Sequence, residues 1–581
     1  MVYQLRHGTV KGKKTKSSDK VAFRIFFGFI ILIISLSLTG CRNDYVSLND
    51  IQIAPSATIE KIPTQIPTVV ELPTNVPPTE VIPGTGYGGG FEPEEIQPTE
   101  VPALTDTPFI EPVIDTSTPT PEIVEPTQDV NQVLPESVPT STSIPPILYY
   151  TQAGDTLPAI AVRFKVSIDD IISAETLTKT GFLDPNILLM IPPMFSDLAS
   201  NLKLMPDSEI VFSPSALDFD IDSFVADAGG YLSTYREYLN SEGWINGAGV
   251  IRKVAIENSI NPRLLLSLLQ YKSNWVYGQP ANENSIQYPL GHVAKYKNGL
   301  YFQLTWAVSQ VSYSYYGWRE GIMTDILFTD KTKFRASPDI NAGTYSIQYL
   351  FAQMYSLSDW EAVLYGQDSF PQVHERMFGN PWLRAVAIEP LFPATLQQPT
   401  LILPIEQDEE WSLTGGPHSA WGNQGARAAL DFAPGGAKGC ALSSEWVLAA
   451  ASGVVARSGG GVVVLDLDGD GNEQTGWNLF YMHIATEDRP EVGQWLEQGD
   501  QLGHPSCEGG VSTGTHFHFA RKYNGEWILA GGPLPFDLDG WIAHADAQDY
   551  KGTLTRNGKV VTACTCGTAD TYIFRDKNSP N

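Results

Sequence analysis

The sequence predicts a multidomain protein in which a β-rich domain of antiparallel sheets follows an all-α domain and a small module of order β-α-α-β. Three observations support this. The chain has 581 residues, more than one hydrophobic core usually organises. Helical apolar patterning fills residues 213–395, and short strands between glycine-rich turns fill residues 401–544. The formal net charge of −28 argues against nucleic acid as a partner, because a general nucleic-acid binder carries basic patches.

Residues 1–41 have the composition of an export signal. Several lysines precede an apolar run, Ile25 to Leu38, which is too short for a comfortable membrane span and suits a signal-peptide core. The run ends in Leu38-Thr39-Gly40-Cys41, which resembles the bacterial lipoprotein lipobox. The resemblance implies cleavage before Cys41 and lipid attachment to its thiol, which would anchor an exported protein to the outer face of the cell membrane. An uncleaved N-terminal anchor is the alternative, and it also leaves the remainder outside.

Residues 42–147 predict a disordered linker. This stretch holds 19 of the 42 prolines, much threonine and glutamate, and a single lysine, Lys61. Such a composition buries too little apolar surface to offset the entropy of ordering the chain. We therefore expect an extended tether ahead of the folded domains.

Residues 148–193 predict the small β-α-α-β module. Asp155 is a plausible N-cap for a first helix, Ser167-Ile168-Asp169-Asp170 opens a second, and residues 188–192 form a closing strand. The order, together with Gly154-Asp155-Thr156, resembles a LysM module. The resemblance implies binding of N-acetylglucosamine runs in peptidoglycan or chitin, with Gly154, Asp155 and Thr156 at the glycan. A small unrelated unit of the same order is the alternative.

Residues 213–395 predict a helical, aromatic-rich domain. Asn261-Pro262 is a good N-cap and first-turn pair, and residues 260–275 resemble the active-site helix of the lytic transglycosylases, which implies a lysozyme-like domain. That family places its general-acid Glu directly before the serine, where this chain has Lys272, and an ammonium cannot replace a carboxylic acid of raised pKa. Glu283, from a nearby loop, is a candidate replacement, although no spacing requires it. We interpret the domain as a non-catalytic glycan cleft; a structural spacer and an unconventional glycosidase are the alternatives.

Four histidines and one aspartate stand in distinctive contexts in residues 396–548. His418 ends Gly415-Gly416-Pro417-His418, Asp431 follows thirteen residues later, His483 follows a strand, and His516 and His518 lie in Gly514-Thr515-His516-Phe517-His518-Phe519. Residues two apart on a strand face the same side, so His516 and His518 can both point into one groove. Two imidazoles and a carboxylate suit zinc and leave a fourth position open for catalysis.

These motifs, in this order, resemble the lysostaphin and beta-lytic group of zinc endopeptidases. Carried over residue by residue, the resemblance makes His418, Asp431 and His518 the Zn²⁺ ligands and gives His483 and His516 catalytic roles beside the metal. It implies hydrolysis of peptide cross-links or bridges in bacterial peptidoglycan, the expected partner. A non-enzymatic wall-binding or hydrolase-activating protein is the alternative.

The remaining features are expected to be structural. Outside the cytoplasm, the four later cysteines suggest disulfides, with connectivity that the sequence leaves open: Cys440, Cys507, Cys564 and Cys566. Asp466-Leu467-Asp468-Gly469-Asp470-Gly471 mimics the start of an EF-hand loop, but Trp477 stands where a bidentate Glu belongs, which favours a β-turn. His504 and His544 match no ligand position. Residues 549–581 predict a C-terminal hairpin and tail of unreadable function.

Overall fold

The computed structural model describes residues 52–53, 145–195, 198–436 and 439–577, and the predicted signal peptide with Cys41 and nearly all of the predicted linker lie outside these ranges. The described residues from 145 onward pack as one unit. Among the described residues, no helix has both the length and the apolar content needed to cross a membrane.

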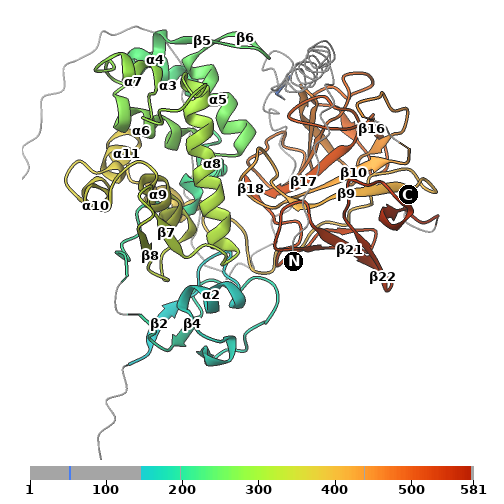
Figure 1. The fold of residues 1–581 in the computed structure, drawn as a ribbon, viewed down its shortest axis with the longest axis horizontal. Helices are drawn as coiled ribbons and strands as arrows, with labels where there is room; N and C mark the ends of the chain where they lie inside the picture. The colour runs from blue at the N-terminus through green and yellow to red at the C-terminus, as the bar shows by residue number, and fades with distance from the viewer. Residues whose placement is uncertain (1–51, 54–144, 196–197, 437–438, 578–581) are drawn as a thin grey trace, which may run out of the picture. The chain divides into compact units, whose positions relative to one another are not determined.

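The small module contains one α-helix and a three-stranded sheet of order β2-β4-β3 (Figure 1). Its elements are β2 (Ile147–Tyr150), α2 (Leu157–Phe164), η1 (Ile168–Asp170), β3 (Ile172–Ser173) and β4 (Leu188–Ile191). The expected second helix is only the single 3₁₀ turn η1, although the predicted capping box at Ser167 is present. The prediction for the first cap was wrong by one residue, because the Thr156 side chain accepts the amide of Ala159. The Asp155 carboxylate is instead buried, where it pairs with Arg163 and accepts the Tyr149 hydroxyl at 2.5 Å.

Residues 213–395 are mainly helical, and two short hairpins depart from the predicted all-α domain. The helices are α3 (Ile221–Ala228), α4 (Tyr231–Thr234), α5 (Gly247–Asn258), α6 (Pro262–Ser273), α7 (Glu283–Gln287), α8 (Leu300–Arg319), α9 (Ala342–Ala352), α10 (Leu357–Tyr365), α11 (Phe370–Phe378) and α12 (Pro381–Ile388). The hairpins are β5 (Arg236–Leu239) with β6 (Gly243–Asn246), and β7 (Asp325–Leu327) with β8 (Lys333–Arg335). The long helix α8 packs against α5 and α9 (Figure 1). Asn261 caps α6, as predicted, by accepting the amide of Arg263.

The C-terminal region is built on an antiparallel sheet of order β1-β12-β13-β14-β17-β10-β9-β23, with β15 beside β12 and β18 beside β17. The strands are β1 (Gln52–Ile53), β9 (Trp411–His418), β10 (Ala429–Pro434), β12 (Gly453–Gly459), β13 (Val462–Asp466), β14 (Trp477–Met482), β15 (Trp495–Leu496), β17 (Phe517–Tyr523), β18 (Glu526–Trp527) and β23 (Tyr572–Ile573). A two-stranded sheet pairs β11 (Val447–Leu448) with β16 (Gln501–Gly503). A four-stranded sheet contains β19 (Asp537–Leu538), β20 (Trp541–Ala545), β21 (Gly552–Arg556) and β22 (Lys559–Thr562), so the predicted C-terminal hairpin is β21 with β22.

Both faces of the large sheet are buried: all residues of β13 and all but the first residue of β14 are buried. Alternate residues such as Leu479 and Phe519 pack into a core formed within the C-terminal region. The intervening residues, among them Phe480 and Ala520, join the core of the helical region. The sheet therefore shares one of its faces with the helices.

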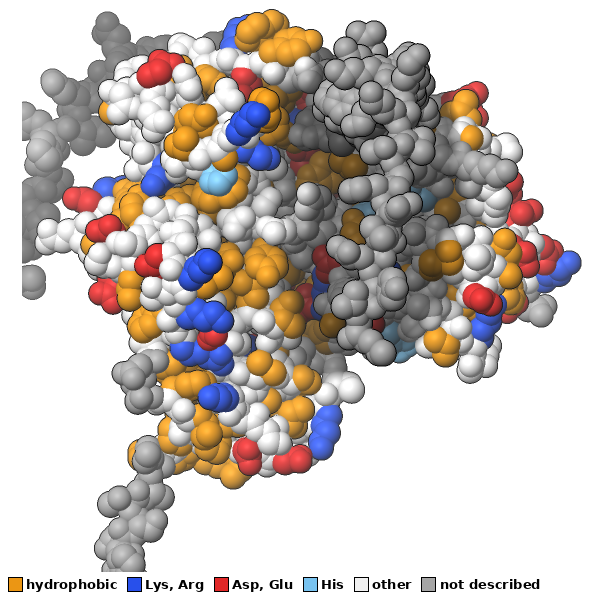
Figure 2. Space-filling view, in the orientation of Figure 1, with side chains coloured by type: hydrophobic (Ala, Val, Ile, Leu, Met, Phe, Trp, Pro, Cys, Tyr) orange, Lys and Arg blue, Asp and Glu red, His pale blue; other side chains and the backbone are white. Residues whose placement is uncertain are grey.

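Buried polar contacts reinforce this shared core. Arg319, the last residue of α8, binds Asp207 at 2.9 Å and Glu526 of β18 at 3.1 Å. The amide of Trp527 donates to the Tyr316 hydroxyl at 3.0 Å. A Cβ on Gly525 would lie 2.1 Å from the carbonyl oxygen of Phe212, so glycine allows the two backbones to meet there. On the face shown in Figure 2, acidic, basic and hydrophobic side chains are interspersed.

Candidate metal centre

Three adjacent strands carry the three predicted ligands. His418 ends β9, Asp431 lies in β10, and His518 is the second residue of β17. Asp431 stands directly opposite His518 in the antiparallel pairing of β10 with β17. A register shift between β9 and β10 places Ala429 opposite His418 and Asp431 opposite Gly415. Side chains far apart in the sequence therefore converge on one patch of the sheet.

The three ligand atoms form a compact triangle. His418 Nε2 lies 3.3 Å from Asp431 Oδ1 and 3.1 Å from His518 Nδ1, and His518 Nδ1 lies 3.2 Å from Asp431 Oδ1. Neighbouring ligands of a tetrahedral zinc are separated by about 3.3 Å when each lies about 2.0 Å from the metal. All three side chains are buried. The spacing and the donor set therefore fit a zinc ion.

Hydrogen bonds orient both ligand imidazoles. His418 Nδ1 lies 2.8 Å from the Gly416 carbonyl oxygen, and His518 Nε2 lies 3.0 Å from the Ala420 carbonyl oxygen. Since a carbonyl only accepts, each of these ring nitrogens carries the hydrogen, and the opposite nitrogen presents its lone pair to the triangle. Asp431 Oδ1 is also buried and receives no hydrogen bond from the described residues. The three ligand atoms therefore point lone pairs at one another with no hydrogen between them. A cation would bind to such a group of atoms.

The electrostatics of the triangle agree with this geometry. Burial would raise the pKa of Asp431, but its interactions with the adjacent imidazoles, that of His418 first, lower it well below its usual range. Burial would lower the pKa of His418, yet the Asp431 carboxylate raises it. Burial lowers the pKa of His518. The site therefore favours an ionised carboxylate with positive charge beside it, which a metal ion supplies.

Gly415 makes room for the carboxylate. A Cβ at this position would lie 2.5 Å from Asp431 Oδ2 and 2.9 Å from Asp431 Cγ. Real side chains do not approach that closely, so the Gly-Gly-Pro-His motif needs glycine here to let Asp431 lie across β9.

His483 and His516 lie beside the triangle. Their ring centroids are 4.5 Å apart, and His516 Nε2 is 3.7 Å from Asp431 Oδ1. His483 Nδ1 lies 2.9 Å from the Glu508 carbonyl oxygen, and His516 Nδ1 lies 2.7 Å from the Gly514 carbonyl oxygen. Both Nε2 atoms are thereby left with free lone pairs. Burial and the neighbouring His516 and His518 lower the pKa of His483 to about 3, so its imidazole is neutral.

Sequence analysis missed Tyr550. Its ring stacks on the His418 imidazole with centroids 4.1 Å apart and an interplanar angle of 21°. Burial and the charges of Asp431 and Asp549 raise the pKa of its hydroxyl. Tyr550 belongs to the segment predicted as the C-terminal hairpin and tail, and no local motif marks it. It reaches His418 because its backbone bonds to Gly416 and Pro417 of β9.

His504 and His544 lie outside this group of residues. His504 packs on Trp446, and His544 is exposed and bonds to Thr555. The disulfides join Cys440 to Cys507 and Cys564 to Cys566. The Asp466–Gly471 segment begins at the last residue of β13 and continues into the connection to β14.

In the helical region, the general-acid position of the transglycosylase motif holds an amine. Lys272 Nζ contacts the Tyr355 hydroxyl at 2.7 Å, and burial lowers the pKa of Lys272 to about 8. Glu283 begins the separate helix α7.

Comparisons with known proteins place these observations in a family context. Residues 203–392 match the model of the LasA N-terminal domain. The chain is 27 % identical to Protease LasA of Pseudomonas aeruginosa over 345 residues, which cover 56 % of this chain and 75 % of the relative. It is 26 % identical to the beta-lytic metalloendopeptidase of Achromobacter lyticus over 172 residues, which cover 27 % of this chain and 43 % of that relative. A solved structure, the M23 metalloprotease pseudoalterin from the deep sea, is 24 % identical, with a TM-score of 0.26, and the match covers 31 % of this chain and 99 % of that one.

The family match gives the helical region a relative, the LasA N-terminal domain, that the transglycosylase motif did not indicate. The transglycosylase resemblance and the LysM resemblance stay predictions. The chain is thus similar in sequence to the LasA and beta-lytic metalloendopeptidases.

Proposed function

We propose that this chain is a zinc-dependent endopeptidase that hydrolyses peptide cross-links or bridges of bacterial peptidoglycan. The observation that carries the proposal is the convergence of His418, Asp431 and His518 within 3.1–3.3 Å of one another, with two further histidines alongside. The similarity to LasA and to a beta-lytic metalloendopeptidase supports the same reaction class.

The proposed chemistry follows from which ring nitrogens are free. His418 Nε2, His518 Nδ1 and Asp431 Oδ1 would hold the zinc, which when bound supplies the Lewis acid needed to hydrolyse a peptide bond. His483 and His516 keep Nδ1 on backbone carbonyls and direct Nε2 toward the site. A neutral imidazole in this position can accept a proton from the attacking water and donate one to the departing amine. The buried setting strengthens each of these polar interactions.

The other regions would bring the enzyme to its substrate. We propose that residues 148–193 are a LysM module that binds glycan strands and that residues 213–395 are non-catalytic. We also propose that Cys41 carries a lipid that anchors the protein to the outer face of the cell membrane. The Asp155 carboxylate is occupied by Arg163, and Gly154 is buried against the Arg319 guanidinium. Of the three predicted residues, glycan contact would therefore come from Thr156. Thr156, Thr180 and Gly181 line a cavity of about 440 Å³, which supports a ligand at this loop. Binding to the glycan would raise the local concentration of peptide cross-links.

The test compares the full chain with its His518→Ala variant on purified peptidoglycan. We expect new peptide amino termini from the wild type, about one zinc per chain, and loss of both in the variant. His544→Ala is the matched control, because the exposed His544 ring lies on the four-stranded sheet and bonds to Thr555, and this variant should retain zinc and activity.

Full activity in His518→Ala would refute the proposal. Binding to peptidoglycan without any product would point to the non-enzymatic alternative, and new reducing ends without new amino termini would assign the reaction to the helical region.

A further inference from the structure

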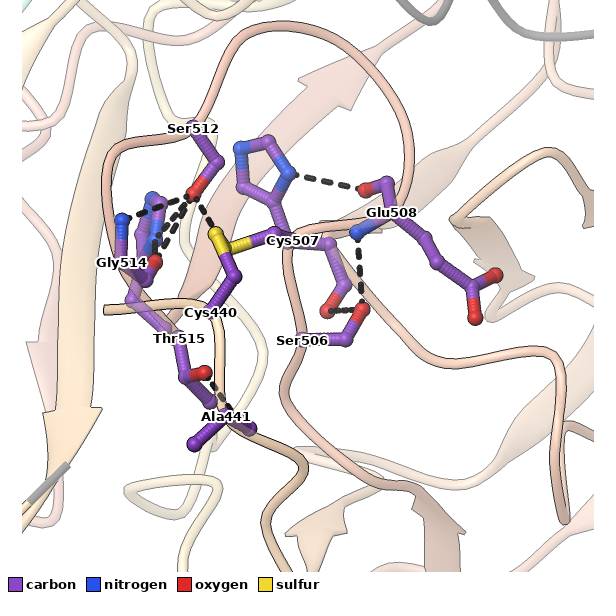
Figure 3. Close-up of a disulfide and its surroundings, with 10 residues drawn as sticks. Cys440, Ala441, Ser506, Cys507, Glu508, Ser512, Gly514 and Thr515 are labelled. Atoms are coloured by element: carbon purple, nitrogen blue, oxygen red, sulfur yellow. Dashed lines mark hydrogen bonds between the residues drawn. A yellow bond between two sulfur atoms is a disulfide. The ribbon is translucent and has the colours of Figure 1, made fainter. Parts of the chain in front are cut away.

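A disulfide lies beside the two non-ligand histidines. It joins Cys440, in the loop after β10, to Cys507, in the segment between β16 and β17 (Figure 3). The Ser512 hydroxyl, which lies 3.4 Å from Cys507 Sγ, also donates to the Gly514 carbonyl at 2.8 Å. The bridge therefore belongs to the same loop that leads into the His516–His518 motif.

This loop supplies the hydrogen bonds that orient His483 and His516. The Glu508 carbonyl accepts from His483 Nδ1, and the Gly514 carbonyl accepts from His516 Nδ1. The amide of Ser506 also donates to the His483 carbonyl at 2.7 Å. Both imidazoles are thus held by backbone atoms within seven residues of Cys507, as the sequence numbering shows.

Hydrogen bonds also hold parts of this loop: the Glu508 carboxylate accepts from Thr486, and the Thr515 amide and hydroxyl donate to the carbonyls of Gly439 and Ala441, on either side of Cys440. Between the end of β16 at Gly503 and the start of β17 at Phe517, its pairing is limited to the isolated bridges Pro505 to Ile484 and Ser506 to His516. Gly509 and Gly510 have φ of 70° and 58°, and Val511 is 73 % exposed. The segment from Gly509 to Val511, with two glycines and one exposed valine, has many accessible conformations, and a cross-link at the nearby Cys507 removes some of them.

The zinc ligands are held differently. His418 and His518 lie on strands, and their second ring nitrogens bond to the carbonyls of Gly416 and Ala420, which lie outside the bridged loop. Different backbone segments therefore orient the proposed metal ligands and the two neighbouring histidines.

We propose that the Cys440–Cys507 disulfide is a positioning element for His483 and His516, needed for turnover and dispensable for holding zinc. The inference rests on the proposed peptidase function for its kinetic consequence. In the positioned state, Nδ1 of each imidazole carries the hydrogen and Nε2 faces the site. Without the bridge, the two carbonyls move with the loop, and each imidazole samples both tautomers and other orientations.

The experiment uses the full chain with Cys440→Ser and Cys507→Ser together. The matched control is Cys564→Ser with Cys566→Ser, which removes the other disulfide of the described region. We expect the first double variant to bind about one zinc per chain and to lose 10- to 100-fold in kcat, about the effect of losing an orienting partner. KM should change less, and the pH profile of kcat should shift. The control should keep wild-type kcat.

Ser512→Ala provides a milder test of the same loop, because the Ser512 hydroxyl lies 3.3 Å from His516 Nδ1 and bonds to Gly514. It leaves the disulfide in place, so we expect a smaller loss of kcat and an unchanged zinc content. All rates are measured well below the unfolding temperature of each variant, so that lost stability does not imitate lost positioning.

A readout independent of activity separates this inference from the proposed function. Nitrogen-15 spectra of the imidazoles should show one tautomer each for His483 and His516 in the zinc-loaded wild type, and averaged signals in the Cys440/Cys507 variant. The signals of His418 and His518 should stay unchanged. If the wild type fails to cleave peptidoglycan, the proposed function falls, and these spectra still decide the inference. Wild-type kcat with unchanged spectra in the variant would overturn it, as would loss of zinc from the variant.

Discussion

At the scale of single residues, the site depends on which ring nitrogen of each histidine is free. Each of the four imidazoles donates a hydrogen bond from one ring nitrogen to a backbone carbonyl. The accepting carbonyls are those of Gly416, Glu508, Gly514 and Ala420. The sequence identified all four histidines through their motifs. It could not identify their partners, because a backbone carbonyl has no residue type that marks it.

Tyr550 should stabilise the metal site through its ring. Replacing it with alanine removes the stacking partner of His418, and we expect the zinc affinity to fall by about tenfold, as for other groups that support a ligand. Tyr550→Phe keeps the ring and should retain zinc like the wild type. Chelator competition measures both affinities, and equal affinities in the alanine and wild-type proteins would contradict the stacking role.

Gly415 should tolerate no side chain. In Gly415→Ala the new Cβ would lie 2.5 Å from Asp431 Oδ2, so the carboxylate must move and zinc affinity should fall at least about tenfold. Gly425→Ala is the matched control, since the nearest atom to its Cβ would be 3.6 Å away. Zinc titration of the two variants tests the difference, and similar affinities would show that Asp431 does not need this space.

At the scale of elements, strands were predicted more accurately than the length of the second helix in the small module. The short strands predicted between glycine-rich turns in residues 401–544 are present, among them β12, β13 and β14, because apolar runs between glycines mark them clearly. The predicted second helix of the small module shrank to one turn. Its capping box was a genuine local signal, but the chain enters β3 immediately afterwards.

A buried ion cluster should make the large sheet sensitive to acid. Glu473, between β13 and β14, binds Arg457 and Lys522, and although burial alone would raise its pKa, these two cations lower it to about 2. Because the folded pKa is depressed, the stabilisation is complete above the ordinary value near 4.5 and is lost as the pH falls toward 2.

We expect Glu473→Gln to lower the free energy of unfolding by about 3 kcal/mol at pH 7, since it leaves two buried cations without their anion. The loss should shrink as the pH falls below 4. Chemical denaturation of both proteins at several pH values measures this, and a difference that does not depend on pH would contradict the account.

At the scale of the whole molecule, the helical region and the large sheet share a core. This could not be predicted from sequence, because the contact between Arg319 and Glu526 joins residues 207 positions apart and no local pattern connects them. The motifs named the proposed metal ligands, but no motif named the polar groups, such as Arg319 and Glu526, that are buried between the helical region and the large sheet.

Arg319→Ala should weaken that connection. It leaves Glu526 and Asp207 buried without their cation, which we expect to cost about 3–5 kcal/mol and to separate the thermal unfolding of the two regions into distinct transitions. The matched control is Arg376→Ala, which removes an exposed ion pair with Asp368 and should change stability by less than about 1 kcal/mol. Calorimetry distinguishes them, and a single unshifted transition in Arg319→Ala would show that the contact does not couple the regions.

The central claim is that His418, Asp431 and His518 hold a catalytic zinc. The most direct measurement removes the metal from the full chain with a chelator, restores it by titration with Zn²⁺, and follows new peptide amino termini released from purified peptidoglycan. The account predicts that cleavage disappears with the metal and returns in proportion to zinc, reaching its maximum at about one ion per chain, and that Asp431→Asn is not restored. Cleavage that persists without metal, or that returns equally in Asp431→Asn, would contradict it.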